Sequence, residues 1–188
     1  MSGKTRELWV WAGTREAGRT GLELCRAGRR IAQEMDAKVI ALLPGPAEEA
    51  VLVCAGQSGA QEIVILRDEF SPSREGCAAA LLARIQHSRP ELLLFPADPE
   101  GRELSVRLAA ALGTGAAQDC TDLEWSREQG RVLFTRPVQG GRQMALQMLR
   151  GSGPQIAALR PGACSGGEQR AYDWPFPLVR EERASLSS

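Results

Sequence analysis

The chain has 188 residues, enough to bury the core of one domain with a short extension. Its 23 basic and 23 acidic side chains give no net charge, which argues against a general attraction to nucleic acid or to anionic lipid. No apolar run reaches the roughly 18 residues of a membrane span, and no apolar signal core follows Met1. We therefore expect a cytoplasmic protein with no membrane insertion.

The cysteine pattern argues against a metal site. The cysteines number five, no two are close enough for a zinc knuckle, and His87 is the one histidine. We interpret the thiols as reduced and mostly buried, because a free cysteine behaves as a small apolar side chain. No metal ligands are predicted.

The first half of the chain alternates between two patterns. Short, continuously apolar runs predict buried strands, and apolar residues at helical spacing predict the helices between them. This rhythm predicts an α/β fold, a three-layer α/β/α sandwich around a mainly parallel sheet. The expected elements are strand 8–12, helix 20–35, strand 38–43, helix 47–55, strand 62–66, helix 73–88, strand 91–95 and helix 98–112.

The rhythm changes after Gly115. Strand-like segments at 119–125, 131–136 and 143–149 are separated by short turn sequences, which predict antiparallel hairpins in the C-terminal third. A last short strand is expected at 155–159. Beyond it the periodicity ends, so we divide the chain into a domain at residues 1–163 and an extended or disordered tail at 164–188.

One loop favours a different function. Gly13–Thr20 nearly matches the phosphate-binding pattern G-x-x-x-x-G-K-[ST] and lies between a predicted strand and a predicted helix. Arg19 stands where the pattern needs lysine, and a planar guanidinium does not simply replace a compact ammonium. Two interpretations stay open, a polar loop at the end of a strand or an anion site at a helix N-terminus.

A second candidate site is the segment Asp98–Glu103, at the carboxyl end of the fourth predicted strand, where α/β sheets bind ligands. Gly101 has no Cβ and allows a backbone or a ligand to come close. Arg102 offers a donor fork for a carboxylate or a phosphate. The alternative is a well-capped helix in which Arg102 is paired with an acid.

Arginines mark the hairpin region. Arg136 and Arg160 each precede a proline at the end of a predicted strand, so both are held on stiff backbone. Such placement suits a group that meets a partner or an anion at fixed geometry, and a solvated arginine is the alternative. The sequence shows no nucleophile–base pair and no carboxylate pair at convincing spacing, so we expect no catalytic residues.

Seven motifs follow one another in a specific order in the second half of the chain. They are Gly101-Arg102-Glu103, Arg107–Ala110, Gly113–Gly115, Asp119–Glu124, Thr135–Pro137, Gly140-Gly141 and Arg160–Gly162. Their order and spacing strongly resemble the N-terminal domain of the α subunit of electron transfer flavoproteins. The resemblance covers roughly residues 7 to 163.

This resemblance implies an adenine nucleotide α-hydrolase-like fold and a heterodimer with a β-type subunit. It implies a scaffold, not an enzyme, for electron transfer between flavin dehydrogenases and an acceptor. FAD is expected only in the complete complex, and AMP through the β-type partner. The implied cofactor-binding residues are Gly101, Arg102, Arg136 and Arg160, for a nucleotide or flavin near the partner interface. The implied interface residues are Arg136, Gly140, Gly141 and Arg160.

The sequence also departs from the family. No glycine-rich flavin-binding domain is recognisable after Gly162, so we expect no tight cofactor binding by this chain alone, and a separate flavin domain or dehydrogenase as a further partner. Pro96-Ala97-Asp98 and Arg142 are unusual for the family. Two alternatives stay open. One is a free-standing adenine-nucleotide-binding or regulatory module that uses Gly13–Thr20 and the helix start at Gly101, and the other is a redox enzyme with its own flavin.

Overall fold

The computed structural model describes residues 5–13, 18–45, 49–67, 74–163 and 178–183. Within these ranges seven strands form one sheet, in the order β10-β3-β2-β1-β4-β9-β5, and every neighbouring pair is parallel. The strands are β1 (Arg6–Trp11), β2 (Ala37–Pro44), β3 (Glu62–Arg67), β4 (Leu92–Pro96), β5 (Ala116–Cys120), β9 (Gln155–Leu159) and β10 (Leu178–Arg183).

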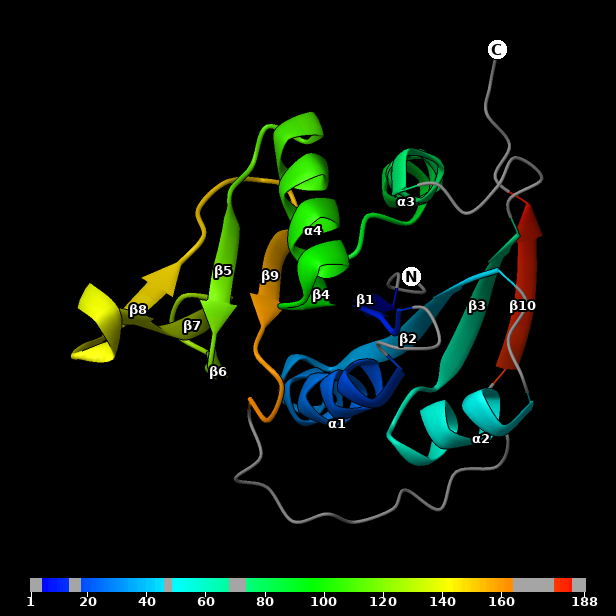
Figure 1. Ribbon diagram of the computed structural model, residues 1–188, viewed down its shortest axis with the longest axis horizontal. Coiled ribbons are helices and arrows are strands. Elements are labelled where there is room, and N and C mark those ends of the chain that lie inside the picture. Colours follow the sequence, from blue (N-terminus) through cyan, green and yellow to red (C-terminus); the bar gives the residue numbers. More distant parts are fainter. Residues whose placement is uncertain (1–4, 14–17, 46–48, 68–73, 164–177, 184–188) are drawn as a thin grey trace.

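Helices cover both faces of this sheet (Figure 1). In strand β1, Leu8 and Val10 join the core cluster beneath helix α1, whereas Trp9 and Trp11 join the cluster beneath α3 and α4. Because successive strand residues point to opposite faces, a fully apolar strand supplies both cores. The predicted α/β/α sandwich is therefore confirmed. The helices are α1 (Gly18–Met35), α2 (Glu49–Gln57), α3 (Arg74–Ser88) and α4 (Pro99–Ala111).

A small antiparallel sheet lies beyond the β5 edge, at the opposite end of the molecule from β10 (Figure 1). It consists of β6 (Asp122–Ser126), β7 (Arg131–Val138) and β8 (Gln143–Met148), in the order β6-β7-β8. Its inner face is part of the main core, since Val132 and Phe134 are fully buried in the cluster beneath α1. The predicted hairpins are thus present, and they are packed on the domain.

Gln155 joins the two sheets. This first residue of β9 is buried, and its side-chain amide accepts a hydrogen bond from Val132 N and donates one to Val132 O, each at 2.8 Å. The amide thereby satisfies the backbone of β7 as a neighbouring strand would. A polar side chain inside the core is stable here because both of its hydrogen bonds are made.

The structure corrects one expectation. The single strand expected at 119–125 is divided into β5, which joins the parallel sheet, and β6, which joins the hairpin. Near the end of β5 the register against β9 shifts between Ala117 and Cys120, and Asp119 there has a φ of 59°, a conformation that aspartate tolerates better than most residues. Residues 178–183 lie in the tail that was expected to be extended or disordered, and they form strand β10 beside β3. Among the described helices, none is both long and apolar enough to cross a membrane.

Candidate functional site

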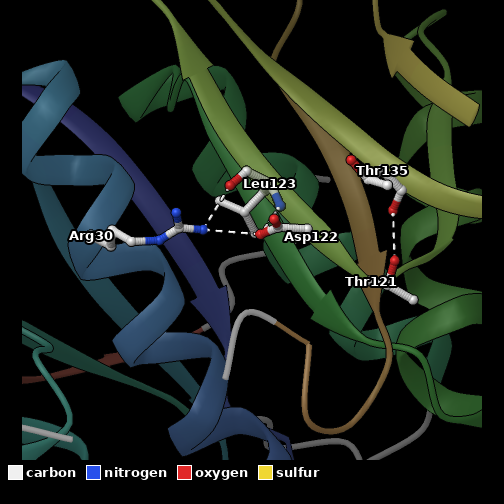
Figure 2. A network of polar contacts seen from close by, with 5 residues as sticks. All are labelled: Arg30, Thr121, Asp122, Leu123 and Thr135. Atoms are coloured by element: carbon white, nitrogen blue, oxygen red, sulfur yellow. Dashed lines mark hydrogen bonds and ion pairs between the residues drawn. The ribbon is translucent and has the colours of Figure 1, made fainter. Parts of the chain in front are cut away.

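The site begins where the chain passes from β5 into β6, and a network of polar contacts fixes this passage (Figure 2). Arg30 reaches from α1, and its Nη2 atom donates to Asp122 Oδ1 at 3.1 Å and to the Leu123 carbonyl at 2.7 Å. The backbone N–H of Thr121 donates to Thr135 O at 2.8 Å, so the start of β6 is tied to β7. The hairpin sheet is therefore held against α1 at a defined position.

A carboxylate organises two of the arginines that the sequence singled out. Asp119 Oδ1 lies 2.5 Å from Arg102 Nη2 and 3.7 Å from Arg160 Nε. Arg102 comes from the start of α4, Asp119 from the end of β5 and Arg160 from the position after β9. The shorter contact is the stronger one, so Asp119 neutralises the charge of Arg102 more than that of Arg160. Arg102 thus meets the acid that one of its two interpretations required.

The start of α4 is capped by Asp98 and packs tightly against the end of β4. Asp98 caps the helix, since its side chain accepts a hydrogen bond from Gly101 N at 2.7 Å. A Cβ added to Gly101 would lie 2.1 Å from the Pro96 carbonyl oxygen. Gly101 is therefore required by contact between α4 and the end of β4, and a ligand is not needed to explain it.

The β7–β8 turn, in contrast, borders a pocket of about 460 Å³. The pocket is lined by residues 136–141 and by Arg160. In this turn Gly140 has a φ of 66° and Gly141 a φ of 85°, and a Cβ added to either would meet no atom within 4 Å. Gly140 and Gly141 therefore border open space, whereas the packing around Gly101 leaves no room for a Cβ.

One lining residue carries an unsatisfied polar atom. Arg136 Nε is buried, and it has no hydrogen-bond partner among the described residues. Buried polar atoms are nearly always paired, because leaving one unpaired costs about 1–3 kcal/mol. An orphaned guanidinium nitrogen beside a pocket is the kind of group that a ligand or a partner satisfies.

The structure brings together some of the residues predicted for the site. Arg136, Gly140, Gly141 and Arg160, the expected interface set, all line the same pocket. Of the expected cofactor set, Gly101 and Arg102 do not line it, although Arg102 is connected to Arg160 through Asp119. Sequence reasoning gave no role to Asp119 or to Gln139, which also lines the pocket. The phosphate-loop-like segment cannot be compared in the same way, because residues 14–17 lie outside the described ranges.

Comparison with known proteins identifies the family of this chain. Residues 13–176 match the electron transfer flavoprotein domain. The chain belongs to the electron transfer flavoprotein family. It is 34% identical to Protein FixB of Clostridium saccharobutylicum and 32% identical to an electron transfer flavoprotein subunit alpha of Clostridium acetobutylicum, over 82% of this chain and 47% of each relative. It is 27% identical to an acryloyl-CoA reductase electron transfer subunit beta of Anaerotignum propionicum, over 87% of this chain and 52% of that protein. The predicted membership is thus confirmed, and the chain spans about half the length of the curated relatives it matches.

This electron transfer flavoprotein domain also exposes apolar side chains next to the pocket. Met144 is 56% and Leu146 is 64% exposed on β8. Their cross-strand partners on β7 are Pro137 and Thr135, so all four lie on the face of the hairpin sheet that points away from Phe134. Pro137 also lines the pocket. The pocket and the apolar face therefore meet at the same end of the hairpin.

Thiols in this member of the family are mostly internal. Cys25, Cys77 and Cys120 are buried, Cys54 is exposed, and none of these four forms a disulfide bond. Burial raises the pKa of the Cys25 thiol from 9.0 to about 12, although nearby Arg26 lowers it. The Cys25 thiol therefore stays protonated and unreactive at neutral pH. Cys164 lies outside the described residues.

Proposed function

We propose that the chain is an α-type electron transfer flavoprotein subunit that works as a scaffold. In this role it pairs with a β-type subunit in the cytoplasm. The complete complex carries electrons between flavin dehydrogenases and an acceptor, and the chain contributes no catalytic residue of its own. Membership of the family, together with relatives named as electron transfer flavoprotein subunits, supports the class of function.

The observation that carries the scaffold role is the exposed end of the hairpin sheet. Met144 and Leu146 present large apolar side chains to solvent on one face of β8. Burying an exposed side chain of this size contributes about 1.5–3 kcal/mol. The adjoining Gly140 and Gly141 carry no side chain that would keep a partner away from the turn. We assign this end, including Arg136 and Arg160, to the interface with the β-type subunit.

The expected cofactors are consistent with this scaffold role. FAD, where the complex holds it, supplies the one- and two-electron chemistry. The residues that line the pocket of this chain include two guanidinium groups and no aromatic ring. They suit an anion and offer no surface for stacking a flavin ring. We therefore assign the redox FAD to a separate flavin domain or dehydrogenase, and any tightly bound AMP to the β-type partner.

The test is co-expression of the chain with the β-type subunit from the same source, followed by affinity capture and size-exclusion chromatography. We expect a one-to-one complex for the wild type and its loss for Leu146→Glu, because the substitution places a charge in an apolar contact. Val106→Glu is the matched control, since Val106 is 51% exposed on α4, away from the hairpin. A wild-type chain that captures no β-type subunit would overturn the proposal, as would a complex that survives Leu146→Glu unchanged.

A further inference from the structure

The pocket beside the β7–β8 turn contains more positive charge than the fold uses. Arg136 and Arg160 both line it, and no lining residue is acidic. Arg136 Nε is buried and lacks a hydrogen-bond partner in the described part of the chain. Packing of this domain alone gives no reason to bury that atom, because an unpaired polar atom destabilises the fold.

Arg160 is only partly neutralised. The acid beside it, Asp119, lies 3.7 Å from Arg160 Nε but 2.5 Å from Arg102 Nη2. Asp119 is therefore committed mainly to Arg102. About half of the Arg160 side chain remains exposed, at 48%. Its guanidinium keeps donors available for a further acceptor.

The shape of the pocket narrows the class of ligand. A volume of about 460 Å³ is within the range of about 300–1,000 Å³ found for small-molecule sites, and it exceeds what a lone inorganic anion fills. Pro137 and Val138 add apolar surface beside the two arginines. Two guanidinium groups next to apolar surface suit a phosphate carried on a larger organic group.

We propose that this pocket binds the phosphate group of a nucleotide, with Arg136 and Arg160 as its donors. The inference goes beyond the scaffold role, because it concerns a ligand held by this chain itself, without the β-type subunit. Two charge contacts in an open pocket hold such a ligand weakly, with a dissociation constant of about 0.1–1 mM. The proposal is therefore compatible with a chain that binds no cofactor tightly.

The test is isothermal titration of the isolated 188-residue chain with AMP, with inorganic phosphate and with adenosine, at low and at physiological salt. We expect AMP to bind, phosphate to bind more weakly, and adenosine to show no measurable binding. Arg136→Gln and Arg160→Gln should each weaken AMP binding about tenfold, which corresponds to one lost charge-assisted contact. Arg160→Lys should retain more affinity than Arg160→Gln, because it keeps the charge and loses the fork.

The control is Arg127→Gln, which removes the same charge at the opposite end of the hairpin sheet, before β7. Far-UV circular dichroism and a thermal melt show whether Arg136→Gln is folded, and the exposed Arg160 provides an independent variant if it is not. Binding of adenosine as strong as that of AMP, no binding of AMP, or equal losses in Arg127→Gln and Arg160→Gln would each overturn the proposal. Inorganic phosphate that binds as tightly as AMP would overturn its nucleotide part. Because no β-type subunit is present, these outcomes are separate from those of the co-expression test.

Discussion

Two regions of the molecule, the closed end at the carboxyl ends of β1 and β4 and the open end at the β7–β8 turn, use glycine in opposite ways. At the carboxyl ends of β1 and β4, Gly21 and Gly101 let helices α1 and α4 approach the strands so closely that an added Cβ would lie 2.4 Å from Ala12 O and 2.1 Å from Pro96 O. At the β7–β8 turn, Gly140 and Gly141 have open space around them and a pocket beside them. A glycine-rich motif can therefore indicate either close contact within the fold or a surface that is open to a partner.

The largest effect that we expect comes from the closed end. Gly101→Ala places a methyl group against the Pro96 carbonyl, a backbone atom that cannot move aside, so the free energy of unfolding should fall by about 3 kcal/mol. For a chain of this size the melting temperature should fall by roughly 6–12 °C. Urea unfolding measures the effect.

Gly153→Ala is the matched control for this substitution. Its new methyl group would meet Thr114 Cβ at 3.8 Å, an ordinary contact, so its stability should stay within about 0.5 kcal/mol of the wild type. If Gly101→Ala and Gly153→Ala unfold at the same urea concentration, the distinction between a closed and an open end fails.

An intermediate effect is expected at the junction of the two sheets. Gln155→Ala removes both hydrogen bonds to the Val132 backbone inside the core, which should cost about 2 kcal/mol. Hydrogen exchange should show that the amides of Val132 and Phe134 lose protection more than those of β1. Gln143→Ala, at an exposed position of β8, should leave both quantities unchanged. Uniform loss of protection across the chain would mean that Gln155 does not specifically hold the hairpin.

The smallest effect that we expect is the pH dependence of stability that comes from Cys25, in the core beneath α1. The Cys25 thiol has a pKa of about 12 when folded, against 9.0 ordinarily, so above pH 9 the unfolded chain loses a proton that the folded chain keeps. Stability is therefore fully present below pH 9 and falls as the pH rises toward 12. Between pH 8 and pH 10 the wild type should lose about 1.4 kcal/mol more than Cys25→Ala, measured by urea unfolding. Parallel pH profiles for the two proteins would show that Cys25 is not protonated and buried as described.

Much of the closed end was predictable from sequence, because its signals are local. Continuously apolar strands and regularly spaced apolar helix positions repeat along the first half, and each indicates its own element. The capped start of α4 is equally local, since Asp98 and Gly101 are three residues apart.

The open end was predictable in outline only. Its hairpin turns follow from glycine-containing segments, but the arrangement of its charges is non-local. Asp119 meets Arg102 from 17 residues away and forms an ion pair with Arg160, which follows β9. The division into β5 and β6 depends on the two sheets that receive them, and the pairing of β10 with β3 joins distant segments of the chain. No spacing pattern within the sequence encodes such contacts.

We propose that the open end binds a partner while the closed end maintains the fold. The most direct measurement is the affinity of the β-type subunit for the wild type and for the Met144→Glu/Leu146→Glu double variant, with the free energy of unfolding measured on the same samples. We expect the double variant to lose affinity about a hundredfold or more, roughly 2.7 kcal/mol, while its free energy of unfolding stays within about 0.5 kcal/mol of the wild type. An unchanged affinity, or a loss that merely follows unfolding of the variant, would contradict it.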